Sequence, residues 1–334
     1  MTLYRNVEEA FISELREVLT NGEDIEVRKS KTREARGRVI EIEAIRERCV
    51  LLPGRLNNIF ASIAESMWVL AGRNDLEYLS AYLPRAKDFS DDGTTWRAGY
   101  GPRLRNWNGV DQLSRIIDIL RSEPNSRRAV AILFDPDRDF VESKDIPCNN
   151  WLHFLVRDGK LNLHVAARST DIWWGFSGIN AFEWSLLLEV MSFWLQLAPG
   201  RMTFFTSSLH LYERHAERAE SLLEGVVEGS ATLYSSGQIE TPKFGTPWES
   251  SGQTIDEWMR LEQLLRTGSD LDDLKTDLAD PMLVSYIQMI DLFWNLKRTS
   301  SSSTIGSKLE RLGDTDLRHA ASEYIHRGRD RIVS

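Results

Sequence analysis

The sequence contains few cysteines, no long apolar run and no excess of positive charge. Two cysteines, Cys49 and Cys148, stand among 334 residues, which excludes a disulfide framework, and their spacing predicts no metal site. No run approaches the roughly 18 apolar residues of a membrane-spanning helix. A net charge of −9 disfavours general electrostatic binding of nucleic acid, although a local basic pocket can still bind a phosphate. We therefore expect no membrane and no nucleic-acid partner.

The amino-terminal segment is charged and amphipathic. Residues 5–20 place Val7, Phe11, Leu15 and Leu19 on one helical face, and they lack the apolar stretch of a signal peptide. We expect a cytoplasmic protein. The chain is long enough for one large domain with a substantial core, or for one domain plus an appendage.

Apolar periodicity predicts an α+β fold, in which helices pack on a mixed sheet and further helices form a C-terminal extension. The expected helices are residues 5–20, 55–72, 110–123, 182–198, 254–267, 281–298 and 315–330. The expected strands are residues 127–135, 151–157, 160–169 and a segment from residue 201, with one more after a basic loop near residue 27. An Asp-Gly turn joins the second and third of these strands. The polar residues 85–108 and 235–253 are expected to form a loop and a linker.

Cys148 stands at a chain bend, in "KDIPCNNWLHF". A lone cysteine is often a small core residue, but the adjacent proline and asparagines favour a position at the mouth of a strand. A nucleophilic cysteine needs nearby cations or oriented dipoles to become a thiolate. Arg127, Arg128, Arg168 and Ser169 offer such groups; they are either solvated at strand ends or gathered around an anion such as a phosphate.

Other polar side chains are compatible with either a site or ordinary packing. Asp171 can pair with an arginine or orient a ligand, and Asn180 can cap a helix or bind a ligand. His210 and Tyr212 alternate, so they share one face of an extended segment. Glu65 lies in an apolar helix; if it is buried, its pKa is raised and it suits proton relay. The sequence shows no phosphate-binding Walker loop, dinucleotide fingerprint or zinc-hydrolase motif.

An ordered set of motifs within residues 25–220 resembles the superfamily of thymidylate synthases and pyrimidine-nucleotide hydroxymethylases. The motifs are "AESMWVLAG", "GYGPRL", "NSRRAV", "PCNN", "ARSTD" followed by "GF", and "SLHLYERH". Two of them are closer to the deoxycytidylate hydroxymethylases. Synthases usually have His after the cysteine and Asp-Thr-His in the last motif, where this chain has Asn149 and Ser208-Leu209-His210.

The resemblance implies covalent catalysis with 5,10-methylenetetrahydrofolate as co-substrate. Cys148 would add to C6 of the pyrimidine, so that C5 becomes nucleophilic enough to attack the one-carbon unit. Glu65 would order water and relay protons, Tyr100 would line the pocket of the nucleophile, and Asp171 would lie near base and folate. Trp68, Trp173 and Trp174 are read as packing residues or as a platform for folate.

The resemblance also implies a pyrimidine nucleoside monophosphate as substrate and a homodimer. Arg127 and Arg128 would reach across the dimer interface to bind the 5′-phosphate, together with Arg168 and Ser169. An arginine of the early basic loop would join them; Arg28 matches best, with Arg33 and Arg36 as rivals. His210 and Tyr212 would hold the sugar 3′-hydroxyl.

The base-reading position leaves cytosine and uracil open. Asn180 fits that position only if one residue is inserted after Gly175; without the insertion Ile179 falls there. An acid there accepts from the amino group of cytosine, whereas an amide both donates to and accepts from uracil. The flanking motifs favour cytidylate, and Asn180 favours uridylate.

These observations predict a folate-dependent C5 hydroxymethylase of dCMP or dUMP. The alternatives are reductive methylation of dUMP by a thymidylate synthase, and a nucleotide-binding relative without activity. The catalytic domain is expected at residues 1–235, and a mainly helical extension packed on it at residues 236–334.

Overall fold

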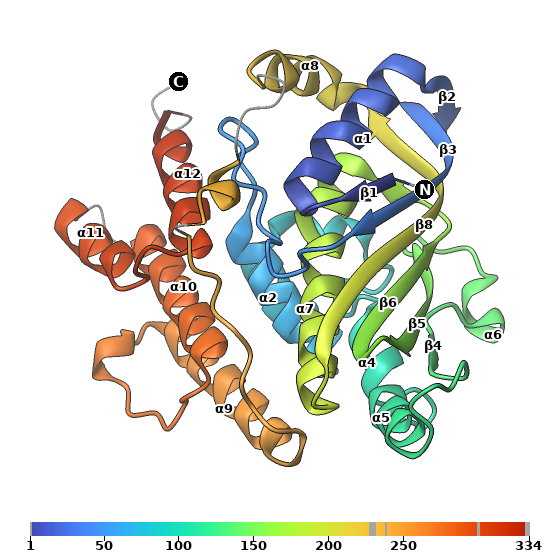
Figure 1. Ribbon diagram of the computed structural model, residues 1–334. Helices are drawn as coiled ribbons and strands as arrows, with labels where there is room; N and C mark the ends of the chain where they lie inside the picture. Colours follow the sequence, from blue (N-terminus) through green and yellow to red (C-terminus); the bar gives the residue numbers. More distant parts are fainter. Residues whose placement is uncertain (1, 227–231, 238, 299–300, 331–334) are drawn as a thin grey trace.

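The computed structural model describes residues 2–226, 232–237, 239–298 and 301–330 (Figure 1). Within these residues a mixed sheet of eight strands has the order β1-β3-β8-β6-β5-β4, with β2 beside β3 and β7 beside β8. The strands are β1 (Thr2–Tyr4), β2 (Glu23–Val27), β3 (Ser30–Ile42), β4 (Val130–Ile132), β5 (Asn149–Arg157), β6 (Lys160–Ala167), β7 (Thr170–Asp171) and β8 (Ala198–Tyr212). The predicted α+β class is confirmed.

One face of the sheet is covered by helices. Alternate residues such as Ile40, Phe154, Val165 and Phe204 are fully buried on this face, as the two-residue period of a strand requires. The helices α1 (Val7–Asn21) and α7 (Ala181–Trp194) pack against it. Because α7 has apolar residues on all sides and is buried along its length, it forms the centre of the core.

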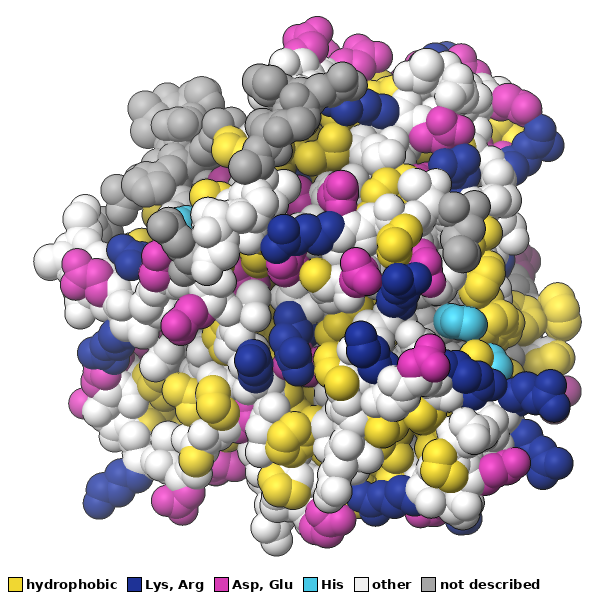
Figure 2. Space-filling view, viewed as in Figure 1, with side chains coloured by type: hydrophobic (Ala, Val, Ile, Leu, Met, Phe, Trp, Pro, Cys, Tyr) yellow, Lys and Arg dark blue, Asp and Glu magenta, His cyan; other side chains and the backbone are white. Residues whose placement is uncertain are grey.

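The opposite face of the sheet carries a patch of aromatic and aliphatic side chains. Trp151 and His153 contact Phe205 and His164 through their rings. Val130, Ile132 and Phe205 are 37–49% exposed, and the register places Val130 beside His153 and Ile132 beside Trp151. Histidine and apolar side chains lie together on the molecular surface over β5 (Figure 2). We call Val130, Ile132, Trp151, His153, His164 and Phe205 the outer-face patch.

The C-terminal helices pack beside the sheet domain. In the amino-terminal part the further helices are α2 (Ile59–Leu70), α3 (Leu76–Tyr82), η1 (Pro84–Phe89), α4 (Tyr100–Arg105), α5 (Gln112–Ser122), α6 (Pro136–Asp139), η2 (Ile172–Asn180), η3 (Glu213–His215), α8 (Ala216–Glu224) and η4 (Leu233–Ser236). They are followed by α9 (Trp248–Thr267), η5 (Leu271–Asp273), α10 (Pro281–Arg298), α11 (Ser302–Glu310) and α12 (Asp316–Asp330). Both α10 and α12 contact α2, and one continuous hydrophobic cluster spans them. The helical character of the extension is thus confirmed, whereas its separation as a domain at residue 235 stays a prediction. None of the helices in the described residues is long and apolar enough to cross a membrane.

Several elements differ from the sequence-based expectation. The basic loop near residue 27 is a tight hairpin between β2 and β3, and the expected strand at 127–135 keeps only Val130–Ile132. The region 85–108 contains η1 and α4, and α9 begins at Trp248 inside the expected linker, of which residue 238 lies outside the described residues. The helix α11 was not predicted, because its serine-rich sequence has a weak apolar pattern. The Asp158-Gly159 turn is confirmed, with φ of 51° and 71°.

A buried ionic network ties the C-terminal helices to the sheet domain. The Arg48 guanidinium pairs with Glu189 of α7 and donates to Tyr286 Oη of α10 at 3.2 Å. Both Arg48 and Glu189 are almost fully buried. Removing one partner of such a pair leaves an uncompensated charge in the interior.

We therefore expect Arg48→Ala to lower the free energy of unfolding by about 3–5 kcal/mol, measured by denaturant titration. Arg201→Ala is the control, because Arg201 pairs with Glu41 and Glu43 at the surface and should contribute less than about 1 kcal/mol. Equal losses for the two variants would contradict this account of the interface.

Candidate active site

Cys148 and Arg168 lie side by side at neighbouring strand ends. Cys148 directly precedes β5 and Arg168 directly follows β6, and Asn149 pairs with Ala167. The Arg168 amide donates to Cys148 O at 2.9 Å. The Arg168 guanidinium donates to the carbonyls of Pro147 at 2.9 Å and Ile146 at 2.8 Å, and its Nη2 lies 3.7 Å from Cys148 Sγ. One arginine thus fixes the bend that presents the thiol.

Cys148 is solvent-exposed, yet nearby protein atoms still desolvate its sulfur and raise its pKa. The guanidinium of Arg168 opposes this rise, while Asp145 and Asp171 add to it. Arg28 also favours the thiolate. The thiol therefore depends on its arginine neighbours for ionisation.

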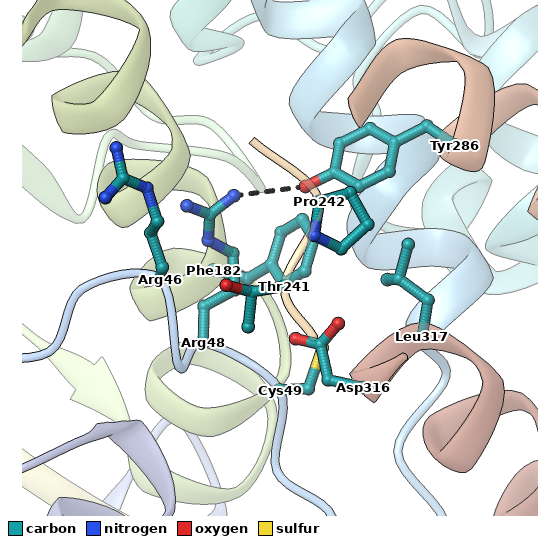
Figure 3. Close-up of a pocket in the computed structure, with 9 residues that line it drawn as sticks. All are labelled: Arg46, Arg48, Cys49, Phe182, Thr241, Pro242, Tyr286, Asp316 and Leu317. Carbon is teal, nitrogen blue, oxygen red and sulfur yellow. Dashed lines mark hydrogen bonds between the residues drawn. The ribbon is translucent and has the colours of Figure 1, made fainter. Parts of the chain in front are cut away.

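Cys49 has a different environment, at a small cavity between the sheet domain and the C-terminal helices (Figure 3). The cavity of about 10 Å³ is lined by Arg48, Tyr286 and Asp316, among others, and is no larger than one water molecule needs. Cys49 is 1% exposed, and burial raises its pKa well above the usual value. It is a structural cysteine, so Cys148 is the candidate nucleophile.

Tyr100 holds the start of β5 through hydrogen bonds. Its hydroxyl accepts from the Asn149 amide nitrogen at 3.2 Å and from Asn149 Nδ2 at 2.8 Å. Burial raises the pKa of Tyr100, and the charge of Cys148 adds to the rise. The short helix α4, within a region expected to be loop, places Tyr100 there.

Several carboxyl groups interact electrostatically with one another or with the thiol. Burial raises the pKa of Glu65 on α2 to about 8, and Asp145 contributes to the rise. Asp145 in turn raises the pKa of Cys148. Glu183 of α7, which belongs to none of the motifs, is buried, and burial together with the charge of Glu65 raises its pKa. Its signal in the sequence is a carboxyl on a helix that is apolar all round.

Asp171, His210 and Tyr212 also come together. The register of β7 and β8 pairs Asp171 with His210, and the rings of His210 and Tyr212 lie 5.3 Å apart. Desolvation lowers the pKa of His210, and Asp171 opposes that change. Asp171 Oδ1 accepts from the backbone of Trp173 at 2.8 Å. The predicted common face of His210 and Tyr212 is confirmed by strand β8.

Asn180 ends a π-helix, η2. Its side chain makes no capping hydrogen bond to α7, so the helix-cap interpretation is wrong. Asn180 Oδ1 instead lies 3.4 Å from where a Cβ on Gly175 would stand, which turns it toward the Thr170–Asp171 strand. A π-helix accommodates an extra residue relative to an α-helix and often does so at functional sites. The winding of η2 is thus compatible with the one inserted residue after Gly175 that Asn180 needs to fit the base-reading position.

The three arginines of the early basic segment, Arg28, Arg33 and Arg36, differ in their contacts. Arg33 donates to Asp24 at 2.9 Å and Arg36 to Glu23 at 2.8 Å. Arg28 is exposed at the two-residue β2–β3 turn with φ of 50°, a strained region for a side chain other than glycine. Its charge influences both Cys148 and Tyr212. Of the three arginines, Arg28 is thus the one whose charge acts on Cys148 and Tyr212.

Arg127, Arg128 and Ser169 are not brought into this constellation by side-chain contacts. Ser169 adjoins Arg168 and is half-buried. Arg127 and Arg128 are exposed before β4, and Val130 already pairs with His153, five residues beyond Cys148. At about 3.3 Å per residue this is roughly 16 Å or more along the strand. The two arginines therefore lie away from the Cys148 of their own chain.

The tryptophans divide by exposure. Trp68 and Trp173 are buried core residues, whereas Trp174 is 44% exposed next to Asp171. Trp174 is thus available to stack on a planar ligand, such as folate. The described residues contain no group of side chains that could hold a metal ion.

Comparison with known proteins places this geometry in a family. The family model described as "Thymidylate synthase" matches residues 9–243. The chain belongs to the thymidylate synthase family. The match covers strands β2 to β8, Cys148 and every predicted site residue, and ends before α9.

Individual relatives in the family carry two names. The deoxyuridylate hydroxymethyltransferase of Bacillus phage SP01 is 38% identical over 207 residues, 58% of this chain and 54% of its own. That of Pseudomonas phage M6 is 31% identical over 294 residues, 85% of this chain and 81% of its own. The thymidylate synthase of Enterobacteria phage T4 is 29% identical over 196 residues, 53% of this chain and 67% of its own. The chain thus spans about half the length of the Bacillus phage relative.

The contrast between the cysteines gives a direct prediction. Iodoacetamide should alkylate Cys148 and leave Cys49 unmodified in the folded protein, as followed by peptide mass spectrometry. In Arg168→Ala the midpoint of the pH–rate curve should move to higher pH, and alkylation at pH 7.5 should slow several-fold, since a cation favours the thiolate. Arg201→Ala is the control and should leave the curve unchanged. Faster reaction of Cys49, or a midpoint at lower pH in Arg168→Ala, would contradict the assignment.

Proposed function

We propose that this protein is a folate-dependent hydroxymethylase that acts on C5 of dUMP. The observation that carries the proposal is the exposed thiol of Cys148 in a chain of the thymidylate synthase family. The backbone amide of Arg168 donates to the Cys148 carbonyl, and the Arg168 guanidinium approaches the Cys148 sulfur.

The reaction begins with covalent activation of the base. The Cys148 thiolate forms a bond to C6, and the electron pair of the C5=C6 bond moves toward C4–O4, which makes C5 nucleophilic. C5 attacks the methylene carbon of methylenetetrahydrofolate; C5 then loses its proton and tetrahydrofolate leaves, so that an exocyclic methylene remains. Water adds to this methylene, a proton passes to a base of the protein, and the C6–S bond breaks to release 5-hydroxymethyl-dUMP.

Each predicted residue receives a role in this scheme. Glu65 orders water and relays protons, Tyr100 holds the β5 end beside the nucleophile, and Asp171 faces base and folate. The substrate-binding set consists of Arg28, Arg168, Ser169 and the partner's Arg127 and Arg128 for the phosphate, His210 and Tyr212 for the 3′-hydroxyl, and Asn180 for the base.

Uracil is favoured over cytosine by Asn180. Its amide can donate to O4 and accept from N3–H of uracil, and the π-helix is compatible with the inserted residue that this assignment requires. The relatives from the Bacillus and Pseudomonas phages are named for deoxyuridylate, which supports the same choice.

Hydroxymethylation is favoured over methylation by Asn149 and the "SLHLYERH" motif, and by the names of these two relatives. Reductive methylation is the second candidate, because other relatives are named thymidylate synthase. The two reactions share every step up to the methylene intermediate.

A homodimer is the proposed active form. The outer-face patch leaves aromatic and aliphatic side chains exposed, as expected of a surface that pairs with a second copy. Arg127 and Arg128 precede β4, which carries part of this patch, so pairing through it offers them a route to the partner's site. Two free cysteines suit the cytoplasm that we propose as the location.

The first test is product analysis with dUMP and methylenetetrahydrofolate. The expected products are 5-hydroxymethyl-dUMP and tetrahydrofolate, without the absorbance change of dihydrofolate formation. Cys148→Ala should lose at least about a hundredfold in rate while it still binds dUMP. Thymidylate with dihydrofolate would establish the second candidate, and no turnover of dUMP, dCMP or CMP would indicate a binding protein without activity.

The dimer is tested by mixing inactive chains. Cys148→Ala and the double variant Arg127→Ala/Arg128→Ala should each be inactive, but a mixed dimer has one site with an intact thiol and the partner's arginines. After random exchange of subunits, about a quarter of all sites should be intact, which gives about a quarter of wild-type activity. A mixture of Cys148→Ala with Arg168→Ala is the control and should recover nothing, because that pair acts within one chain. No recovery in mixed dimers confirmed by native mass spectrometry would contradict the shared site.

A further inference from the structure

Glu183 has an unusual environment among the buried glutamates of this chain. It lies in the first turn of α7, is 2% exposed, and neither of its carboxyl oxygens has a hydrogen-bond partner in the described residues. By contrast, Glu189 of the same helix pairs with Arg46 and Arg48. The buried Glu14 and Glu262 likewise have arginine partners. A carboxyl that only served packing would be expected to have such a partner.

The neighbours of Glu183 are the residues of the proposed site. Helix α2, which carries Glu65, packs against α7, and burial together with the charge of Glu65 raises the pKa of Glu183. Its charge also influences Tyr100 of α4, and the next residue, Trp184, packs against the Tyr100 ring at 5.2 Å. Beyond Tyr100 and Glu65 stand Cys148 and Asp145. Glu183 therefore lies at the inner end of the cluster that ends at the thiol.

We propose that Glu183 is a positioning residue that acts through Glu65: the two carboxyls share a proton and together accept the proton of the water that attacks the exocyclic methylene. This inference rests on the proposed function and names the residue pair that serves its final step. Two buried carboxyls whose charges interact cannot both ionise easily, so they bind and release a proton as a unit.

The step balances without any further reagent. The water oxygen forms a bond to the exocyclic carbon, and the electron pair of the exocyclic double bond moves through C5 toward C4–O4. One water proton passes to Glu65, so that the carboxyl pair then holds two protons. The electron pair then returns from O4, C5=C6 re-forms and the C6–S bond breaks, after which the carboxyl pair gives its proton to the thiolate or to solvent.

The test compares wild type with Glu183→Gln, which keeps the size of the side chain but cannot exchange the proton. We expect hydroxymethyl product formation to slow about a hundredfold, with KM for dUMP little changed. Tritium release from [5-³H]dUMP should persist as a burst of about one equivalent per site, because loss of the C5 proton precedes water addition. The rising limb of the pH profile of kcat should move to higher pH, since a proton shared between the two carboxyls stabilises the singly ionised pair that accepts the water proton.

Two further variants separate this role from a structural one. Ser185→Ala removes another buried polar group of α7, whose hydroxyl donates to Phe182 O, and should behave as wild type. Glu65→Gln/Glu183→Gln should be no slower than Glu65→Gln alone, because residues that act as a unit are non-additive.

The outcomes are distinguishable from failure of the proposed function. Wild type that forms no hydroxymethyl product would reject the proposed function itself. Active wild type, with Glu183→Gln unchanged in kcat and pH profile, would reject the role of Glu183 alone. Absence of the tritium burst in Glu183→Gln, or additive losses in the double variant, would also reject it.

Discussion

The side chain of Arg168 imposes the constraint on which the site depends. It fixes the backbone conformation of residues 146–148, because its guanidinium donates hydrogen bonds to two successive carbonyls there and approaches the sulfur. The same cation offsets the desolvation that raises the pKa of the thiol. Arg168 thus links backbone shape to chemical reactivity, and the pairing of β5 with β6 places it there.

The remaining groups occupy two sides of this bend. On one side the strand β8 brings His210 and Tyr212 beside Asp171, which suits a sugar and a base. On the other side the helices α2 and α7 bring Glu65 and Glu183 together in a poorly solvated region. A polar surface and a buried pair of carboxyls are thus both near Cys148, as the proposed hydroxymethylation requires.

Sequence patterns predicted the features that depend on local periodicity and on short motifs. The strands β5 and β6, their Asp-Gly turn and the common face of His210 and Tyr212 follow from alternation alone. Features set by tertiary contacts were not predictable in this way. The π-helical winding before Asn180 is set by packing against α1, α2 and α7. The positive φ of Arg28 was not predictable, because the residue at this turn position is not a glycine. Glu183 was missed because its distinguishing feature, a buried carboxyl without a hydrogen-bond partner in the described residues, depends on tertiary packing.

The central claim is that Cys148 forms a covalent bond with C6 of the nucleotide. The most direct measurement is intact-protein mass spectrometry after incubation with 5-fluoro-dUMP and methylenetetrahydrofolate, since fluorine at C5 cannot leave as the proton does and the adduct should persist. The account predicts a mass increase equal to nucleotide plus folate, located on the peptide that contains Cys148 and absent in Cys148→Ala. An unmodified mass under conditions in which both ligands are bound, or an adduct on any other residue, would contradict it.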